Sequence, residues 1–187
     1  RLIRRQRQMC IRDSPQPVIP FAQSAFDSKM TIYLEDETSK LFLLEIISCG
    51  RNAHEERFQY RRFSSKVLLY RGEKLIYRDN TRYEPGKMPM EGIGLYEGYT
   101  HMANLFLSKL CDRGDADGLD RTSELKEKIW QILDEDSEVD GGVTRLTTGD
   151  LALRIFGHRA QKLQQIAEKI KEIYTSCQIN HKSVMSK

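Results

Sequence analysis

Apolar and polar side chains alternate with a period of two in several stretches of the chain. Residues 29–35 and 150–156 place apolar side chains at every second position, a spacing that predicts strands with one buried face. Residues 41–49 are instead apolar nearly throughout, and Gly50 follows them directly. Because this run is short for a helix and rich in Ile and Leu, it predicts a strand covered on both faces.

A hairpin is predicted in the middle of the chain. Residues 66–78 hold two apolar runs, and Gly72 and Glu73 between them supply the Gly-X pair of a two-residue type II′ turn. Residues 58–61 alternate aromatic and polar side chains, which predicts that the strand before the hairpin includes them. Residues 99–110 fit both strand and helix periods in part, so their pattern leaves the two open.

Helical spacing begins in the second half of the chain. Residues 121–136 carry one apolar stripe, formed by Leu125, Ile129, Ile132 and Leu133. Asp120, Thr122 or Ser123 can cap the N-terminus of this helix, and residues 140–142, Asp-Gly-Gly, are expected to stop it.

A last helix is predicted over residues 158–176, and the polar residues 177–187 after it are expected to form a flexible tail. Its buried stripe is formed by Leu163, Ile166, Ala167, Ile170, Ile173 and Tyr174. Several antiparallel strands followed by helix, strand and helix predict an α+β domain that is predominantly β.

The charge of the chain is unevenly distributed. Its 187 residues, 39% of them hydrophobic, are enough for one globular domain with its own core. The formal net charge is +3, but residues 1–14 contain five Arg and one Asp and carry +4, so the remaining residues carry −1. This removes the main electrostatic argument for a nucleic-acid surface. We interpret residues 1–14 as a non-native tail of adapter or vector origin.

Cysteine usage and hydropathy point to the cytoplasm. The four cysteines lie far apart and form no CxxC pair, which suits reduced thiols better than a zinc module or a disulfide framework. No apolar run approaches the roughly 18 residues of a membrane helix. No apolar segment follows the basic N-terminus either, so a secretory signal is not expected.

The segment 45–63 raises the question of metal or catalytic chemistry. Cys49, His54, Glu55 and Glu56 are residue types that bind nickel or zinc. However, a Cys that ends an apolar strand is usually a small buried hydrophobe, and further ligands at fixed spacing are lacking. A second alternative makes Cys49 the nucleophile and His54 the base of a thiol hydrolase, without an evident orienting group. A turn between two strands is the simpler interpretation.

Residues 113–124 resemble an EF-hand calcium loop only in part. Arg113 stands at the first loop position, where a carboxylate is needed, and Asp120 stands where an aliphatic residue normally packs. An ordinary acidic approach to the following helix is the favoured interpretation.

Glu45 is a carboxylate within an apolar strand. Burying it is costly unless it is paired, and Arg51, Arg57 or Arg61 is the expected partner. A structural ion pair and a polar lining of an interior cavity both remain open.

Arginine and aromatic side chains alternate after the turn. The row consists of Arg57, Phe58, Tyr60, Arg61, Arg62 and Phe63. This composition is typical of protein interfaces, and it also suits stacking of single-stranded nucleic acid. Because the charge outside the N-terminal tail is near zero, we favour a protein partner, with an exposed sheet face as the third alternative.

The ordered set of these segments resembles the UreD family of urease accessory proteins, also called UreH. The central resemblance is "LLEIISCGRNAHEERFQYRRF…LLYRGEKLIYRD", in which Gly50, Arg51, Ala53, Glu56 and Phe58 match the family pattern. "PQPVIPFAQSAF" upstream, and "GYTHMANLFL" and "LTTGDLALRIFGHRAQKLQQIAEKI" downstream, are also similar to the family. The resemblance covers residues 15–176, which we take as the C-terminal part of a UreD-like domain.

The resemblance implies a stack of β-strands with two helices and a cytoplasmic protein that is not an enzyme. It implies partners, namely the urease apoprotein, UreF and the GTPase UreG, and an interior polar path for nickel, held transiently rather than as a tight cofactor. The implied path residues are Glu45, His54 and Glu56. The implied partner face comprises Arg51, Arg57, Phe58, Tyr60, Arg61 and His101. Neither a membrane nor a nucleic acid is an expected partner. The alternative function is a β-rich module that binds single-stranded nucleic acid.

Overall fold

The computed structural model describes residues 3–5, 11–13, 16–110 and 121–182, with side chains for 16–110 and 121–177. The strands are β1 (Ile3–Arg5), β2 (Ile11–Asp13), β3 (Ala25–Leu34), β4 (Leu41–Ser48), β5 (Arg62–Arg71), β6 (Lys74–Tyr83), β7 (His101–Leu107), β8 (Val139–Arg145) and β9 (Leu151–Gly157). The helices are α1 (Arg121–Asp134) and α2 (Ala160–Lys182), and η1 (Asn52–His54) is a single 3₁₀ turn.

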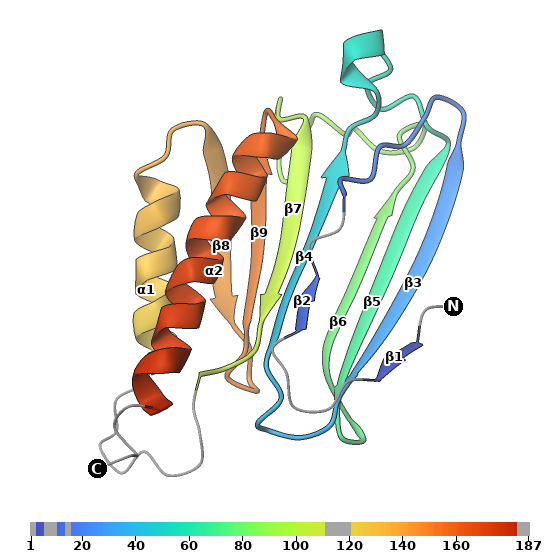
Figure 1. The fold of residues 1–187 in the computed structure, drawn as a ribbon. Coiled ribbons are helices and arrows are strands. Elements are labelled where there is room, and N and C mark those ends of the chain that lie inside the picture. The colour runs from blue at the N-terminus through green and yellow to red at the C-terminus, as the bar shows by residue number, and fades with distance from the viewer. Residues whose placement is uncertain (1–2, 6–10, 14–15, 111–120, 183–187) are drawn as a thin grey trace.

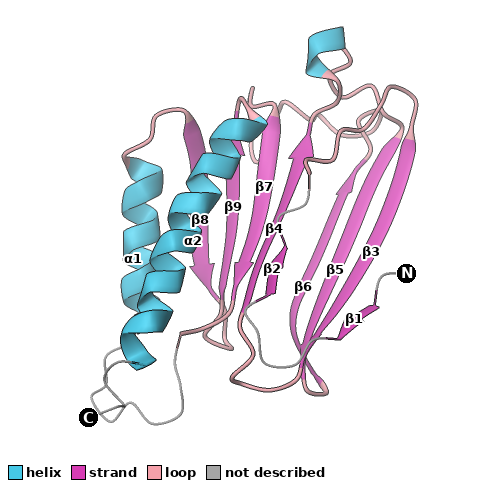
Figure 2. Cartoon of the chain, in the orientation of Figure 1, coloured by secondary structure: helices cyan, strands magenta, loops and turns pink. Residues whose placement is uncertain are grey.

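The elements form three layers (Figures 1 and 2). One sheet has four strands in the order β1-β3-β5-β6, and the other has five in the order β2-β4-β7-β9-β8. Both helices lie against one face of the five-stranded sheet, and the four-stranded sheet packs on its other face. Strand β4 is therefore covered on both sides, as the apolar run 41–49 predicts.

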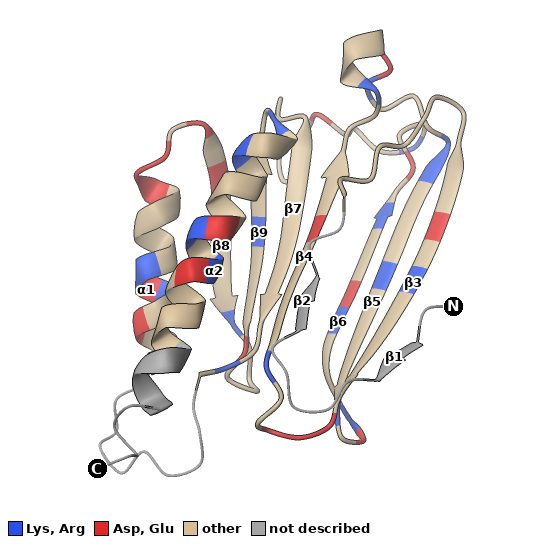
Figure 3. Ribbon diagram, in the orientation of Figure 1, with Lys and Arg blue, Asp and Glu red and all other residues tan. Residues whose placement is uncertain are grey.

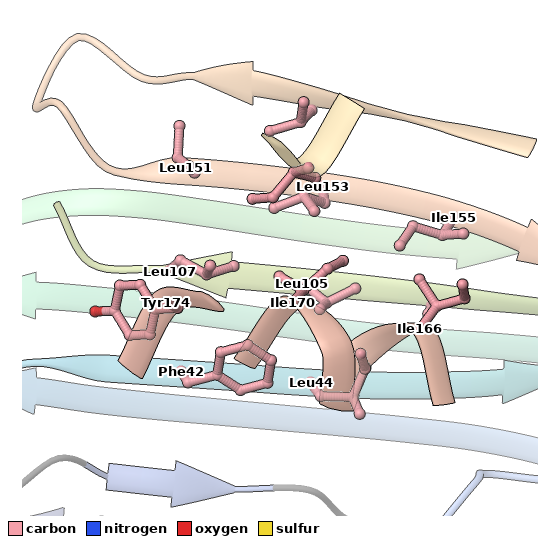
Figure 4. Close-up of a cluster of buried hydrophobic side chains, with 14 of the residues drawn as sticks. Phe42, Leu44, Leu105, Leu107, Leu151, Leu153, Ile155, Ile166, Ile170 and Tyr174 are labelled. Atoms are coloured by element: carbon pink, nitrogen blue, oxygen red, sulfur yellow. The ribbon is translucent and has the colours of Figure 1, made fainter. Parts of the chain in front are cut away.

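The largest core cluster lies between the five-stranded sheet and the helices (Figure 4). The cluster includes Leu44, Leu105 and Leu153, which come from three neighbouring strands. Ile166 and Ile170 of α2 belong to the same cluster. The stripe predicted for the first helix is buried here at Leu125, Ile129 and Leu133. Each such side chain stabilises the fold by about 1.5–3 kcal/mol when fully buried, so this cluster holds the helices on the sheet.

The predicted hairpin is confirmed. Strands β5 and β6 pair in antiparallel fashion, with Tyr70 opposite Leu75 and Arg71 opposite Lys74. Gly72 has φ +58° in the two-residue turn, as the first central position of a type II′ turn requires.

The predominantly β, α+β class is also confirmed, and most long strand pairs are antiparallel. Strands β3 and β5, however, pair in parallel along their full ten-residue length. The chain reaches this arrangement because β4, which lies between them in sequence, belongs to the other sheet. The short strands β1 and β2 also pair in parallel, with β3 and β4 respectively.

Two predicted boundaries in the middle of the chain are wrong. Strand β5 begins at Arg62, because Phe58 has φ +52° and turns the chain before the strand starts. Helix α1 ends at Asp134, and residues 140–142 lie inside β8 rather than at a helix end. Gly141 is needed there because a Cβ would lie 2.6 Å from the Arg154 carbonyl oxygen of β9.

Towards the C-terminus, one predicted strand is confirmed, one ambiguous segment contains a strand, and the last helix is longer than predicted. Strand β9 buries Leu151, Leu153 and Ile155 on one face, as its alternation predicts, and the ambiguous residues 99–110 contain strand β7 (His101–Leu107). Helix α2 runs on to Lys182, beyond its predicted end at residue 176. The EF-hand-like stretch and the Asp120 cap fall largely in 111–120, outside the described residues. Within the described ranges, no helix is long and apolar enough to cross a membrane.

Candidate functional site

The loop of residues 49–61, between β4 and β5, carries most of the predicted site residues. Gly50 has φ +136°, and a Cβ at this position would lie 2.1 Å from the carbonyl oxygen of Glu56. Only glycine permits this close approach. The Phe58 N–H donates to the Cys49 carbonyl at 2.7 Å and closes the loop back onto the end of β4.

An ion pair fixes the centre of this loop. Arg51 contacts Glu56 through two nitrogens, with Nε donating to Oε2 at 2.8 Å. The Ala22 N–H also donates to Oε2, at 3.1 Å, which ties the loop to the segment before β3. The Arg51 hydrogen bond, and then the one from Ala22, hold the pKa of Glu56 below its ordinary value. Glu56 is therefore ionised at neutral pH and engaged in holding the turn.

The other two arginines of the loop are also anchored locally. Arg57 Nε lies 2.6 Å from Glu91 Oε1, and its Nη2 donates to the Tyr99 carbonyl at 3.2 Å. Arg61 Nε donates to the Gln23 carbonyl at 2.8 Å. None of these contacts involves Glu45, so the three arginines expected to pair with it make their described bonds elsewhere.

The aromatic side chains of the predicted row point into the protein. Tyr60 is only 2% exposed and Phe63 only 1%, and both belong to a buried cluster with Tyr83 and Tyr96. Phe58 packs edge-on against Tyr96, with ring centroids 5.0 Å apart. The loop therefore presents arginines at its surface, whereas Tyr60 is part of the core and the half-buried Phe58 packs against it.

The two histidines of the predicted site lie on different elements. His54 is exposed at the end of η1. His101 begins β7, half-buried, with Nδ1 2.8 Å from the hydroxyl of Thr100. That hydroxyl donates to the His158 carbonyl at 2.6 Å, so His101 Nδ1 is the donor in the contact between them. Burial lowers the pKa of His101.

Glu45 lies in the middle of β4 and faces the four-stranded sheet. Ser65 Oγ of β5 donates to its Oε1 at 3.2 Å. Asn104 of β7 stands directly opposite Glu45 in the sheet register. Apolar clusters occupy the space between the sheets on either side of this level, with Leu43 in one and Ile47 in the other.

Further polar side chains lie between the two sheets at the same height as Glu45. Together they form a set that we call the polar layer: Glu45, Ser65, Asp79, Thr81, Asn104 and Arg154. Arg154 Nε donates to Asn104 Oδ1 at 3.0 Å, and its Nη2 lies 3.4 Å from Asp79 Oδ1. Asn104 is 6% exposed, and its Nδ2 has no hydrogen-bond partner among the described residues. The Arg154 side chain is 49% exposed, so the layer reaches solvent at that end.

Sequence reasoning found only Glu45 in this layer. A signal for the others was present, because Asn104 interrupts an apolar strand and Arg154 lies on the opposite face of β9 from Leu153. What the sequence does not reveal is that β4, β5, β6, β7 and β9 bring these positions to one level.

Cys49 is fully buried, and burial raises the pKa of its thiol. A nucleophilic cysteine needs a lowered pKa and access to substrate, so these features disfavour a thiol hydrolase. The described residues contain no group of three or more His, Cys, Asp or Glu side chains placed to hold a metal ion. Glu45 lies within β4, whereas His54 and Glu56 lie in the loop after it.

A buried ion pair elsewhere in the fold was not predicted. Asp150, just before β9, is 0% exposed and accepts from Arg71 of β5 at 2.7 Å and 3.3 Å. It also accepts from the Lys109 N–H and the Thr148 hydroxyl, at 2.9 Å and 2.6 Å. These bonds join the four-stranded sheet to the start of β9, which indicates a structural role.

Comparison with known proteins places the whole arrangement in context. The family model described as UreD urease accessory protein matches residues 7–186. UreD of Acetivibrio thermocellus is 32% identical over 162 residues, which are 86% of this chain and 57% of that protein. UreH of Helicobacter pylori is 32% identical over 87% of this chain and 56% of its own length. UreD of Haemophilus influenzae is 28% identical over 87% of this chain and 59% of its own length.

Two features of these matches bear on interpretation. The chain spans little more than half the length of these relatives. The family match begins at residue 7, within the segment 1–14 that we predicted to be a non-native tail.

Proposed function

Because this chain belongs to the UreD family of urease accessory proteins, we propose that it acts in urease maturation as a scaffold that makes and breaks no covalent bonds. In this role it binds the urease apoprotein and, with UreF and the GTPase UreG, helps to insert nickel. The observation that carries the proposal is the family match over residues 7–186, nearly the whole chain. The names of the family and its relatives describe an accessory role, in agreement with the prediction that the chain is not an enzyme.

Nickel is the cargo of this process, and the polar layer supports a path for it between the two sheets. Ni²⁺ accepts oxygen and nitrogen ligands, and a carrier must hold it weakly enough to release it. Glu45 supplies carboxylate oxygens at a half-buried position, next to the buried Asn104. We place Glu45 on the proposed path.

The other two predicted path residues fit this role less well. The Glu56 carboxylate is occupied by Arg51 and the Ala22 N–H, so a metal ion would have to displace a guanidinium group. His54 is exposed at the surface, where it suits an entry or exit position. We therefore assign Glu56 to the architecture of the loop and keep His54 as a surface candidate.

Partner binding is proposed for the surface of the 49–61 loop. Arg51, Arg57 and Arg61 present guanidinium groups there, and the half-buried His101 lies at the start of β7. Phe58 and Tyr60 support this surface from within rather than forming part of it. Since Tyr60 and Phe63 are buried and Phe58 is half-buried against Tyr96, these rings form no open stack for bases, which disfavours the nucleic-acid alternative.

We place this activity in the cytoplasm. The described cysteines, Cys49 and Cys177, are both free thiols, as expected in a reducing compartment.

Co-purification tests the proposal. The affinity-tagged chain is produced together with the urease subunits and UreF, and the bound proteins are identified by mass spectrometry. We expect urease subunits and UreF to be retained with the chain and not with an unrelated β-rich protein carrying the same tag. Absence of both, when circular dichroism shows that the chain is folded, would contradict the proposed function.

A further inference from the structure

The outer face of the four-stranded sheet carries a concentration of positive charge. We call the outer face the side of β3, β5 and β6 that points away from the five-stranded sheet. No described helix or strand layer lies over it (Figure 1). Alternation along β5 places Val67 and Leu69 inward and Lys66 and Leu68 on this outer side. Figure 3 shows Lys and Arg positions, coloured blue, on all three strands, and acidic positions, coloured red, on β3 and β6.

Two lysines lie side by side at the centre of this face. Lys29 of β3 is the register partner of Lys66 of β5. Arg78 of β6 is the register partner of Leu68, the next outward-facing residue of β5 after Lys66. Like charges directly opposite one another on neighbouring strands are destabilising. No ion pair or side-chain hydrogen bond from the described residues reaches Lys29, Lys66 or Arg78. By contrast, Arg62 on the same face is paired with Asp27.

An apolar area adjoins these cations at the hairpin end of the sheet. Tyr33 and Tyr70 stand opposite each other with stacked rings, 5.2 Å between centroids and 18° between planes. Leu75 is the register partner of Tyr70, and Tyr33 and Leu75 are each 43% exposed. The face therefore combines unneutralised positive charge with an exposed aromatic and aliphatic area.

We propose that the outer face is a docking surface for an acidic segment of a partner protein. The carboxylates of that segment contact Lys29, Lys66 and Arg78, and its apolar side chains cover Tyr33, Tyr70 and Leu75. The charge complementarity supports this occupant, because a carboxylate placed between the two lysines removes their mutual repulsion. The inference goes beyond the proposed function, since it holds whichever protein supplies the acidic segment.

A protein is favoured over a nucleic acid on this face. Binding of single-stranded nucleic acid uses aromatic rings whose flat faces are free to receive bases. The rings of Tyr33 and Tyr70 stack on each other, so each has one face already occupied. The neighbouring Leu75 also suits apolar side chains rather than bases.

Fluorescence anisotropy with a synthetic peptide tests the proposal on the full chain. The probe is a fluorescein-labelled run of glutamates that ends in a leucine and a phenylalanine. Reversal of both charges, Lys29→Glu with Lys66→Glu, is expected to weaken binding about tenfold, as loss of charge complementarity at an interface predicts. The matched control is Lys126→Glu with Lys128→Glu on α1, against the other sheet, which makes the same change in net charge and is expected to leave affinity within about twofold.

Two further variants separate loss of docking from loss of folding or of general electrostatic attraction. Lys66→Glu alone places opposite charges across the strands, so its melting temperature should equal or exceed that of the unchanged chain while peptide binding falls. Tyr33→Ser should weaken binding of this peptide but not of a peptide lacking its two apolar residues. Equal loss of affinity in the outer-face and α1 variants, no peptide binding at all, or equally tight binding of an oligothymidylate would each overturn the proposal.

Discussion

At the scale of single residues, Gly50 determines the shape of the 49–61 loop. Residues that have a side chain rarely adopt its φ of +136°. A Cβ at this position would also lie only 2.1 Å from the Glu56 carbonyl oxygen. Gly50→Ala should therefore lower the free energy of unfolding by at least about 2 kcal/mol, from backbone strain and from displacement of the Arg51–Glu56 turn. Urea denaturation monitored by circular dichroism measures this change.

Gly86 provides the matched control for this substitution. A Cβ at Gly86 would meet nothing within 4 Å. Gly86→Ala should leave the free energy of unfolding within about 0.5 kcal/mol of its original value, because surface positions tolerate such changes. Equal effects of the two substitutions would show that the loop does not depend on the glycine at position 50.

At the scale of elements, the Arg71–Asp150 pair connects β5 to the start of β9. Asp150→Asn keeps the size of the side chain but leaves the buried Arg71 guanidinium without its main countercharge. Breaking a buried pair from one side typically costs about 3–5 kcal/mol. We expect a decrease of that order in the free energy of unfolding, with Glu37 at 3.7 Å offsetting a part of it.

An exposed pair supplies the comparison. Asp27→Asn also removes the carboxylate partner of an arginine, Arg62, but both side chains are largely solvated. Exposed pairs contribute roughly 0–1 kcal/mol, so this variant should unfold nearly as the unchanged chain does. A similarly small effect of Asp150→Asn would show that the buried pair does not hold β5 to β9.

Local sequence patterns predicted where strands and helices lie better than they predicted which strands pair with one another. Alternation located β3, β9 and the hairpin, because each of these strands buries one face whatever it pairs with. Strand β8 was missed because Gly141 and Gly142 resemble a helix stop, whereas Gly141 in fact permits close approach to β9. The parallel pairing of β3 with β5 depends on the chain crossing between sheets, and no local pattern records that.

In the candidate site too, local sequence patterns identified single residues but not their contacts. Glu45 was found from its apolar neighbours, but the arginines expected beside it, Arg51, Arg57 and Arg61, bond within and around their own loop. That loop curls back on itself, which follows from positive φ values at Gly50 and Phe58 rather than from residue spacing. Contacts such as Arg71–Asp150 join positions 79 residues apart, so they became visible only in the fold.

At the scale of the whole molecule, the two sheets enclose polar groups between apolar ones. The polar layer separates the cluster around Leu43 and Val67 from the cluster around Ile47 and Phe63. A buried amide nitrogen that lacks a hydrogen-bond partner, as Asn104 Nδ2 does among the described residues, costs about 1–3 kcal/mol. A fold selected for stability alone would favour apolar residues at this level, so we attribute the layer to function.

The nickel content of urease tests the proposed path through the polar layer most directly. Urease is produced in cells with UreF, UreG and this chain, purified, and analysed for nickel per active site by elemental mass spectrometry. We expect nickel incorporation that depends on the chain. We also expect a several-fold decrease with Glu45→Gln and no decrease with the exposed control Glu35→Gln, both variants being folded and retained by urease. Nickel content with Glu45→Gln equal to that with the unchanged chain would contradict the proposed path, and equal nickel content with no chain at all would contradict the proposed role in maturation.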